Sequence, residues 1–422
     1  MSESRTHVVG AGVAGLAAAV SLVRAGRTVT LYEASGQAGG RCRSYVDAKL
    51  GCAIDNGNHL LLSGNRGVMR YLAEIGADDA LLGPASASFP FLDLRSGRRW
   101  CLRPNRGLVP WWIFDEGRRV PETTAWSYLG AMSFATAGPG HTVRDLVGDD
   151  GVLFERFWEP LAVAVLNTPA CTGAARLLWP VLRETFLRGE RACRPRIART
   201  GLSAALVDPA LDFLRYRGAV VRFGRRLRAM GAWQGRATDL DFGTETVALR
   251  RGDSVVLAVP PSAASSLVPG LTVPGRSHTV VNAHFRLPAP GRLPPELPFL
   301  GLIGGVAQWL FVRSDIASVT VSAADRLAAE PAETIARKTW KDVAAALDLE
   351  GAALPTYRIL KERRATFAQT PEEIRRRPPM RGTWTNVYLA GDWVETGLPA
   401  TIEGAIRSGH MAAQAVVRAR NP

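Results

Sequence analysis

Lysine is nearly missing from this chain. Of the 52 lysine and arginine residues only four are lysines, so arginine carries almost all of the excess behind the formal net charge of +14. The arginines are scattered, and the longest basic run, residues 375–377, is short and has no interleaved aromatic side chain. Nucleic-acid-binding segments combine a dense basic stripe with stacking rings. The sequence therefore predicts no nucleic-acid partner.

Cysteine is also scarce, and its spacing is irregular. The five cysteines are an odd number, and no pair has the C-x-x-C spacing of a metal or redox site. This pattern is not that of a disulfide framework or a zinc centre. We expect a protein of the reducing cytoplasm that holds no metal.

Long hydrophobic runs and an export signal are absent as well. No stretch of 18 apolar residues occurs, and a glycine-rich pattern begins within ten residues of Met1, where an export signal would have its basic and apolar regions. We therefore expect neither a membrane-spanning helix nor secretion. With 422 residues, 47% of them hydrophobic, the chain can fill two hydrophobic cores.

Glycine, by contrast, is abundant and is placed in a telling pattern near the N-terminus. Residues 6–9 read as a buried strand, a G-x-G-x-x-G motif follows at once, and an apolar helical run comes next. A second strand, residues 28–32, ends at an acid. In such an arrangement, the free backbone amides at the helix N-terminus can bind a pyrophosphate, and the carboxylate can bind a ribose. The predicted dinucleotide contacts are Gly10, Gly12, Ala14, Gly15, Glu33 and Ala34.

A second glycine pair narrows the choice of cofactor. Gly39 and Gly40 let the backbone pass close to a ligand, and Arg41 can then offer a forked pair of donors to a phosphate. An acid followed by G-G-R and then by a D-x-G segment at Asp55 resembles the flavin-binding start of the amine oxidase and carotenoid desaturase superfamily. The resemblance implies FAD as cofactor.

Two later regions resemble the remaining parts of that superfamily's cofactor domain. Residues 201–231 and 253–261 look like its returning half, in which the backbone at Leu227 would meet the adenine ring. Residues 386–392 read as a buried strand that delivers Gly391 and Asp392, and a helix begins after residue 399. Amides at that helix N-terminus can stabilise negative charge on a reduced flavin. The predicted contacts there are Pro399, Ala400, Thr401 and Ile402.

These elements predict an α/β fold class. We expect a Rossmann-like FAD-binding domain formed by residues 1–84, 191–264 and 381–422. An interleaved substrate-binding domain of mixed sheet and helices would take residues 85–190 and 265–380. No second glycine motif of this type follows a strand, so no separate nicotinamide domain is expected.

Three segments together are similar to a narrower family. They are IDNGNHLLLSGN at 54–65, KERRATFAQTP at 361–371 and LAGDWVETGLPATIEGAIRSG at 389–409. They resemble the squalene-associated flavoprotein family, whose members are hydroxysqualene dehydroxylases of hopanoid biosynthesis. The resemblance implies an enzyme that reduces a C30 allylic alcohol, hydroxysqualene, to squalene, with hydride from reduced flavin replacing the hydroxyl.

This chemistry needs a proton donor for the leaving hydroxyl, negative or π-rich surroundings for the allylic cation, and N5 of reduced flavin close to the reacting carbon. By the family pattern Gly57, Asn58 and His59 lie beside the flavin, and His59 is the candidate donor, with Asn58 next to it. The alternative is that His59 only holds the pocket in shape, and Asp55 can likewise serve the structure or the cofactor. Arg363 and Thr366 are further catalytic candidates, because their segment lines the site in the superfamily.

A C30 substrate also implies contact with a membrane. Residues 108–114 (LVPWWIF), flanked by Arg103, Arg106, Arg118 and Arg119, predict peripheral attachment to the cytoplasmic face of the inner membrane through Trp111 and Trp112. Internal packing of the segment is the alternative. Other squalene-pathway enzymes are possible partners, and no oligomeric state is indicated. Candidates for a substrate tunnel are Phe154, Phe157, Trp158, Trp179, Phe186, Trp309 and Phe311.

Other functions compete with this interpretation. A squalene or carotenoid desaturase would run the same flavin pocket in the oxidative direction. An amine oxidase would show a pair of aromatic residues near the C-terminal motif, but here Trp393 is followed by Thr396 and Leu398. A non-catalytic flavoprotein that organises a terpenoid pathway is the alternative outside the enzymes.

Overall fold

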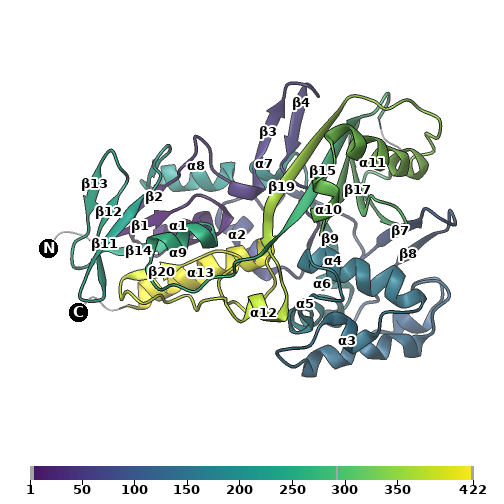
Figure 1. The fold of residues 1–422 in the computed structure, drawn as a ribbon, viewed down its shortest axis with the longest axis horizontal. Coiled ribbons are helices and arrows are strands. Elements are labelled where there is room, and N and C mark those ends of the chain that lie inside the picture. Colours follow the sequence, from purple (N-terminus) through teal and green to yellow (C-terminus); the bar gives the residue numbers. More distant parts are fainter. Residues whose placement is uncertain (1–3, 291–292, 420–422) are drawn as a thin grey trace.

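The protein is described by a computed structural model that covers residues 4–290 and 293–419. Two large sheets stand at opposite ends of the molecule, with helices packed around each (Figure 1). The fold class is α/β as predicted, with one fully parallel sheet and one mixed sheet. The domain boundaries given above stay a prediction.

The first sheet has five parallel strands in the order β10-β2-β1-β14-β20. Its central strands are short and almost wholly buried, which is typical of a parallel sheet covered on both faces. The strands are β1 (Arg5–Val9), β2 (Thr28–Tyr32), β10 (Val220–Arg222), β14 (Ser254–Leu257) and β20 (Val387–Leu389).

Helices cover one face of this sheet. They are α1 (Val13–Arg24), α8 (Asp208–Tyr216) and α13 (Ile402–Arg418). The helices α1 and α13 lie against each other, and a Cβ at Gly409 would stand 2.2 Å from the carbonyl oxygen of Ala14. Only glycine permits that approach. The other face meets α9 (Pro261–Leu267) and a small antiparallel sheet of β11 (Ala229–Trp233), β12 (Arg236–Asp241) and β13 (Thr246–Ala248).

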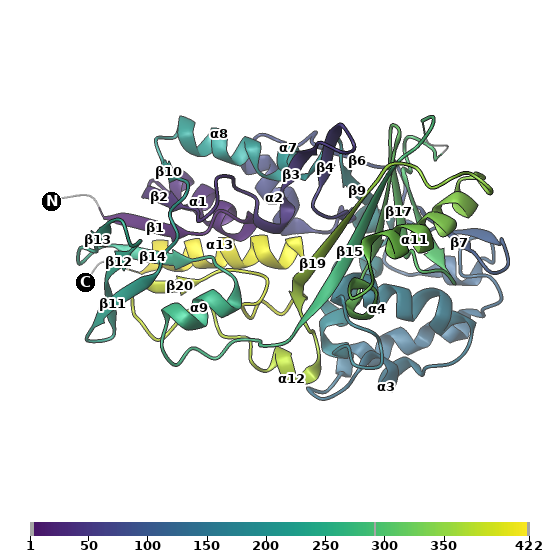
Figure 2. The ribbon, with the colours of Figure 1, turned by 45° about the horizontal axis from the view of Figure 1, so that its top comes forward.

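The second sheet has seven strands in the order β19-β15-β18-β17-β16-β7-β8. Its two longest strands, β15 and β19, run side by side from this sheet toward the N-terminal end of α13 (Figure 2). One face packs on α11 (Ala332–Ala346). The strands are β7 (Phe89–Asp93), β8 (Arg99–Leu102), β15 (Ser277–Arg286), β16 (Phe299–Ile303), β17 (Trp309–Arg313), β18 (Ile316–Val321) and β19 (Tyr357–Phe367).

Short helices between β8 and β9 form a third region. It holds the 3₁₀ helices η2 (Trp111–Phe114), η3 (Ala125–Thr136), η5 (Ala175–Leu177) and η6 (Phe186–Arg188), the π-helical turn η4 (Phe154–Trp158), and α3 (Val143–Val147), α4 (Glu159–Leu166), α5 (Leu178–Glu184) and α6 (Glu190–Cys193). No helix in the described parts of the chain has both the length and the apolar content needed to cross a bilayer.

The remaining elements connect these regions. They are η1 (Gly40–Cys42), β3 (Ser44–Asp47), β4 (Cys52–Asp55), β5 (Leu61–Leu62), α2 (Arg66–Glu74), β6 (Leu81–Leu82), β9 (Pro195–Ala198), α7 (Leu202–Leu206), α10 (Asp325–Ala328) and α12 (Pro371–Ile374).

The structure corrects one half of the predicted membrane contact. Trp111 is 46% exposed, but Trp112 is only 5% exposed and packs edge-on against Tyr128 with ring centres 5.4 Å apart. The expectation of a surface role for Trp112 is therefore wrong. Its indole belongs to the hydrophobic core.

Candidate FAD and substrate site

The glycine motif forms a turn whose first two glycines differ in backbone conformation and in the space around them. Gly10 has φ of +104° and donates its amide to the carbonyl of Tyr32 at 2.7 Å, and a Cβ there would stand 2.3 Å from the carbonyl oxygen of Ala258. Gly12 has an ordinary φ of −70° at the N-cap of α1. A Cβ on Gly12 would meet nothing within 4 Å. The space in front of the α1 N-terminus therefore fits a pyrophosphate.

Glu33 stands at the end of β2 beside this turn. Its carboxylate accepts the amide of Ala11 at 2.8 Å and the amide of Ser35 at 2.9 Å. The two bonds hold the acid in the position where a ribose would meet it. Ala34 follows on the surface and Ala14 lies in the first turn of α1.

The second glycine pair, Gly39 and Gly40, packs beside the glycine turn. The two turns together form what we call the cofactor cradle. Gly39 donates its amide to the carbonyl of Ala11 at 2.8 Å, and a Cβ on Gly40 would lie 3.4 Å from the Cα of Gly12. Arg41 forms an ion pair with Asp392 at 2.8 Å and also donates to the carbonyl of Ala365. Two predicted contacts 351 residues apart are thus joined, and Asp392 raises the pKa of Arg41.

The C-terminal elements approach the same place, with one correction. Gly391 donates its amide to Ser408 Oγ at 2.7 Å, and Thr401 caps α13 by accepting the amide of Gly404. The amide of Ala400 is already used, because it donates to Gln369 Oε1 at 2.8 Å. The amides of Ile402 and Glu403, the first two of α13, have no hydrogen-bond acceptor among the described residues and fit an anionic ligand.

Asp55 is fully engaged within the protein. One carboxylate oxygen accepts from Ser44 Oγ at 2.6 Å and from the Leu202 amide at 2.9 Å, and the other pairs with Arg313 at 3.3 Å. Of the two roles predicted for it, the structural one accounts for all of these contacts. Leu227 is 9% exposed and packs in the core beside the small antiparallel sheet.

A polar array lies where residues 56–59 meet the second sheet. Asn58 Nδ2 donates to Thr320 Oγ1 at 3.1 Å, and Thr320 Oγ1 donates to Asn282 Oδ1 at 2.8 Å. Asn282 Nδ2 in turn donates to the carbonyl oxygen of Asn56 at 3.2 Å. Gly57 fits beneath, because a Cβ there would stand 3.4 Å from Asn282 Nδ2. The array fixes the orientation of Asn58.

His59 is half-buried and packs over Gly57, whose Cβ position lies 3.8 Å from the imidazole Nε2. Loss of solvation lowers its pKa to about 4, although the nearby Asp55 opposes the shift. No hydrogen bond to the imidazole is found within residues 4–290 and 293–419. At pH 7 this imidazole is therefore neutral.

The other two catalytic candidates lie on β19. Thr366 Oγ1 accepts from Asn167 Nδ2 at 3.0 Å, and Asn167 also donates to the carbonyl of His278 at 3.3 Å. Asn167 has φ of +48° at the end of α4, a conformation that asparagine tolerates well. Arg363 is exposed on the same strand. The structure thus gives Thr366 a buried partner and Arg363 a place on the surface.

Sequence reasoning missed Asn282, Thr320, Asn167 and Gln369. All four are buried polar residues, with 8% exposure or less. The available signal was weak: Asn282 follows two valines in the strand segment TVVNAHF. Their partners lie far away in the chain, so no local motif reveals them.

The aromatic residues proposed for a tunnel lie in one hydrophobic cluster, on the face of the second sheet that also carries the polar array. Phe157 packs on Trp158 at 4.8 Å and on Phe186 at 6.3 Å, and Phe91 joins Trp309 at 5.6 Å between ring centres. Phe154 and Trp179 pack against the cluster, and Phe311 belongs to it. On this face of the sheet, strands β7, β16 and β17 therefore carry aromatic residues, whereas β15 and β18 carry the polar array.

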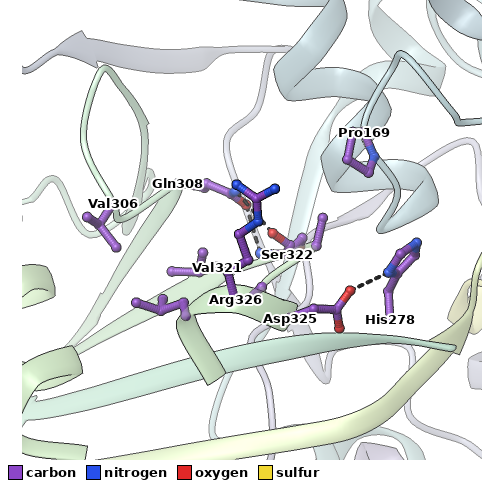
Figure 3. A pocket seen from close by; sticks show the side chains of 11 residues that line it. Pro169, His278, Val306, Gln308, Val321, Ser322, Asp325 and Arg326 are labelled. Atoms are coloured by element: carbon purple, nitrogen blue, oxygen red, sulfur yellow. Dashed lines mark hydrogen bonds and ion pairs between the residues drawn. The ribbon is translucent and has the colours of Figure 1, made fainter. Parts of the chain in front are cut away.

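A cavity of about 440 Å³ lies beside His278, whose partner in the pairing of β15 with β19 is Thr366. Its wall includes Pro169, Gln308 and Ser322, together with His278 and Asp325, whose Nδ1 and Oδ2 atoms pair directly at 2.5 Å (Figure 3). None of the residues of the glycine turns lines it. This cavity is separate from the cofactor cradle.

Comparisons with known proteins agree with this geometry. The sequence profile of the flavin containing amine oxidoreductases matches residues 13–417. The hydroxysqualene dehydroxylase of Rhodopseudomonas palustris is 49% identical over 98% of both chains, and that of Sinorhizobium fredii is 46% identical over 98% of this chain and 99% of its own. Cyclohexylamine oxidase from Brevibacterium oxydans shares the fold, with a TM-score of 0.70 and 16% identity over 99% of each chain.

The resemblance read from the three sequence segments is therefore confirmed. FAD is the cofactor that this family implies, and the glycine turns, the acid of β2 and the α13 N-terminus fit it. The chain belongs to the hydroxysqualene dehydroxylase family of FAD-dependent oxidoreductases, within the flavin containing amine oxidoreductases.

Proposed function

We propose that this protein converts hydroxysqualene to squalene by ionising the allylic alcohol and adding a hydride to the resulting cation. The supporting observation is the polar array of Asn58, Thr320 and Asn282, which lies at the edge of an otherwise aromatic sheet face. Bound FAD, in its reduced form, supplies the hydride. The hydroxyl would leave with one proton as water before the hydride adds, so that hydroxysqualene, a proton and a hydride give squalene and water.

The aromatic cluster gives the hydrocarbon a place to lie. A chain of 30 carbons gains free energy at roughly 25 cal/mol for each Å² of apolar surface that it buries. The hydroxyl, as the one polar group, would then come to the polar array. Rings of Trp309 and Phe91 also favour a nearby cation through their electron-rich faces.

The hydrogen-bond directions of the array support a role for Asn58 in binding the substrate hydroxyl. Asn282 Oδ1 can only accept, so the Thr320 hydroxyl donates to it and must accept from the Asn58 amide nitrogen. The Asn58 carbonyl oxygen is left free of this chain of bonds. It can accept a hydrogen bond from the substrate hydroxyl and then stabilise the positive charge that develops on the carbon.

The pKa of His59 shapes its proposed part in the reaction. A neutral imidazole offers one N–H to the leaving hydroxyl as a hydrogen-bond donor, whereas an imidazolium would exist only under acidic conditions. We therefore assign His59 to polarising the departing oxygen. Thr366, which accepts a hydrogen bond from Asn167, is proposed as a second hydrogen-bond donor to the leaving hydroxyl. Arg363 is exposed, and its proposed catalytic role has the weakest support.

The remaining proposed contacts are those to the cofactor. Gly10, Gly12, Ala14, Gly15, Glu33 and Ala34 would meet the ribose and pyrophosphate, with Gly39, Gly40 and Arg41 closing over them. Leu227 would meet the adenine. Gly57, Asn58, His59, Gly391, Asp392, Pro399, Thr401 and Ile402 would surround the flavin ring and ribityl chain. We place the enzyme in the cytoplasm at the inner face of the membrane that supplies its substrate.

The direction of the reaction can be tested directly. The holoprotein is photoreduced without oxygen and mixed with hydroxysqualene, and we expect flavin absorbance to return with one squalene formed for each flavin. No reoxidation would contradict the proposal. In the opposite arm the oxidised protein is mixed with squalene, and bleaching of the flavin would instead identify a desaturase.

His59 can be tested with two variants. We expect His59→Ala to keep its yellow colour and to lower kcat by about 10²-fold, in the range typical of a lost proton-transfer partner. His59→Gln keeps an N–H donor and should recover part of that loss. Unchanged turnover in both variants would remove His59 from the mechanism.

A further inference from the structure

The 3₁₀ helix η3 carries a stripe of apolar side chains on its outer side. Trp126 is 73% exposed, Leu129 54% and Met132 56%, and they recur every three residues. A 3₁₀ helix has three residues per turn, so these side chains stand one above the other. The next stripe, Tyr128 and Phe134, is buried and anchors the helix.

The neighbouring loop before and within η2 extends the same surface. Leu108 and Val109 are each 72% exposed, Phe114 is 65% exposed, and η2 contacts η3. The loop is held firmly, because the buried amide of Asn105 donates to the carbonyl of Val109 at 2.9 Å and accepts from the Trp112 amide. We call these seven side chains the apolar ridge: Leu108, Val109, Trp111, Phe114, Trp126, Leu129 and Met132.

The composition of the ridge fits the interface of a bilayer. Two of its members are tryptophans, which favour the level of the lipid headgroups. The guanidinium of Arg118 lies 4.8 Å above the Trp111 ring, and the exposed Arg103 and Arg106 stand at the start of the loop. Asp115 and Glu116 pair with Arg118 and Arg119, so charge adds only modestly to an apolar driving force.

The base of the ridge leads toward the proposed substrate site. Tyr128 packs against Trp112 and, at 6.1 Å, against Phe157, and Phe157 reaches Phe186 and then Phe89 on β7. A continuous series of rings thus links the ridge to the aromatic face of the second sheet. The segment lies beside α3, away from the five-stranded sheet (Figure 1).

We infer that the apolar ridge is the membrane-docking surface of this enzyme, with η3 inserting its outer stripe into the headgroup layer. The inference rests on the proposed function, because a C30 substrate resides in the bilayer. Compared with the membrane contact expected from the sequence, the inferred surface also includes η3. It contains Trp126, Leu129 and Met132 but not the buried Trp112. A ridge of this kind lies in the interface without spanning the bilayer.

Vesicle flotation of the holoprotein, without substrate, tests the inference. The triple variant Trp126→Ser, Leu129→Ser, Met132→Ser should lose about tenfold or more of the bound fraction on vesicles of phosphatidylglycerol and phosphatidylethanolamine. Trp233→Ser is the matched control, because Trp233 is 71% exposed on the β11–β12 hairpin at the opposite end of the molecule. It should bind as the unmodified protein does. Equal binding by all three proteins would overturn the inference.

Two further measurements separate the ridge from the chemistry and from other occupants. With hydroxysqualene in detergent micelles, the triple variant should turn over as the unmodified protein does, while on vesicles its rate should fall with its binding. No turnover by any protein in micelles, together with selective loss of vesicle binding, would reject the proposed reaction and keep the ridge. A dimer in sedimentation velocity that the triple variant dissociates would assign the ridge to a second copy and overturn the membrane inference.

Discussion

The two large sheets prepare their ligand sites by different means. At the five-stranded parallel sheet, the groups proposed to bind the cofactor are backbone groups in turns beyond the strand ends, such as the turns at Gly10 and Gly39. In the seven-stranded sheet, the facing groups are side chains in the middle of strands, above all Asn282 and Thr320. One sheet presents its backbone, and the other presents its side chains.

This difference has a physical origin. A dinucleotide carries charge that backbone amides at a helix N-terminus can bind, whichever side chains stand nearby. A branched hydrocarbon with one hydroxyl offers no such charge. It can be held only by shape and by a polar group at one point, and both must come from side chains.

The strongest test of the backbone site compares two glycines two positions apart. We expect Gly12→Val to fold normally but to lose FAD by 10²-fold or more in affinity, because its side chain would fill the open space at the α1 N-terminus. Gly10→Ala should instead destabilise the protein itself, since its Cβ would meet the Ala258 carbonyl at 2.3 Å. Thermal unfolding of the apoproteins and flavin titration separate the two effects. A stable Gly12→Val variant that binds FAD normally would contradict the assignment.

The side-chain site is tested by removing one hydroxyl. Thr320→Val leaves Asn58 Nδ2 and Asn282 Oδ1 without their shared partner, and we expect about a tenfold fall in kcat with FAD retained, at a cost of about 1–3 kcal/mol in stability. Thr339→Val is the control, because Thr339 is equally buried on α11 and bonds only to its own helix. Equal activity in the two variants would exclude the array from the reaction.

A smaller effect concerns one buried histidine in each sheet. Burial lowers the pKa of His7 on β1 and of His284 on β15 to about 4. Between pH 6.5 and 4 the unfolded chain binds protons that these folded groups do not, so stability is present above that window and falls as the pH falls through it. Each histidine should cost about 2 kcal/mol between pH 7 and pH 5.

Urea unfolding at pH 7 and pH 5 measures this loss. His284→Leu should reduce it, because the substitution removes this titrating group and breaks only one side-chain hydrogen bond among the described residues, the one to Ser318. His7 differs, since Tyr32 and Asp253 lie beside it, and His7→Leu would also remove the hydrogen bond between the imidazole and the Tyr32 hydroxyl. If His284→Leu loses as much stability between pH 7 and pH 5 as the unmodified protein does, the lowered pKa of His284 does not cause that loss.

Much of the cofactor site could be predicted because it depends on short stretches of chain. Strand β2 has the bounds expected from its residues, and the turns at Gly10, Gly12, Gly39 and Gly40 follow from local backbone sterics. The family resemblance then supplied the partners at Gly391 and Asp392. The ion pair between Arg41 and Asp392 shows that these distant segments do meet.

The substrate side could be predicted only in outline. Its aromatic residues were identifiable, but Thr320 meets Asn282 across 38 residues of sequence, and Gln369 takes the amide of Ala400 that had been assigned to the flavin. Such partners follow from strand register and loop packing, which no nearby residue encodes. The same holds for Trp112, which turned inward while Trp126 turned out.

The sequence by itself therefore determined the fold class, the family and the FAD-binding turns, because glycine conformations and helix termini act over a few residues. Only the tertiary structure decided which polar side chains form the proposed substrate site and which apolar ones face outward. Both depend on side chains from elements that are distant in the chain. Their positions exist only once strands β15 and β18 have paired and η3 has packed against the core.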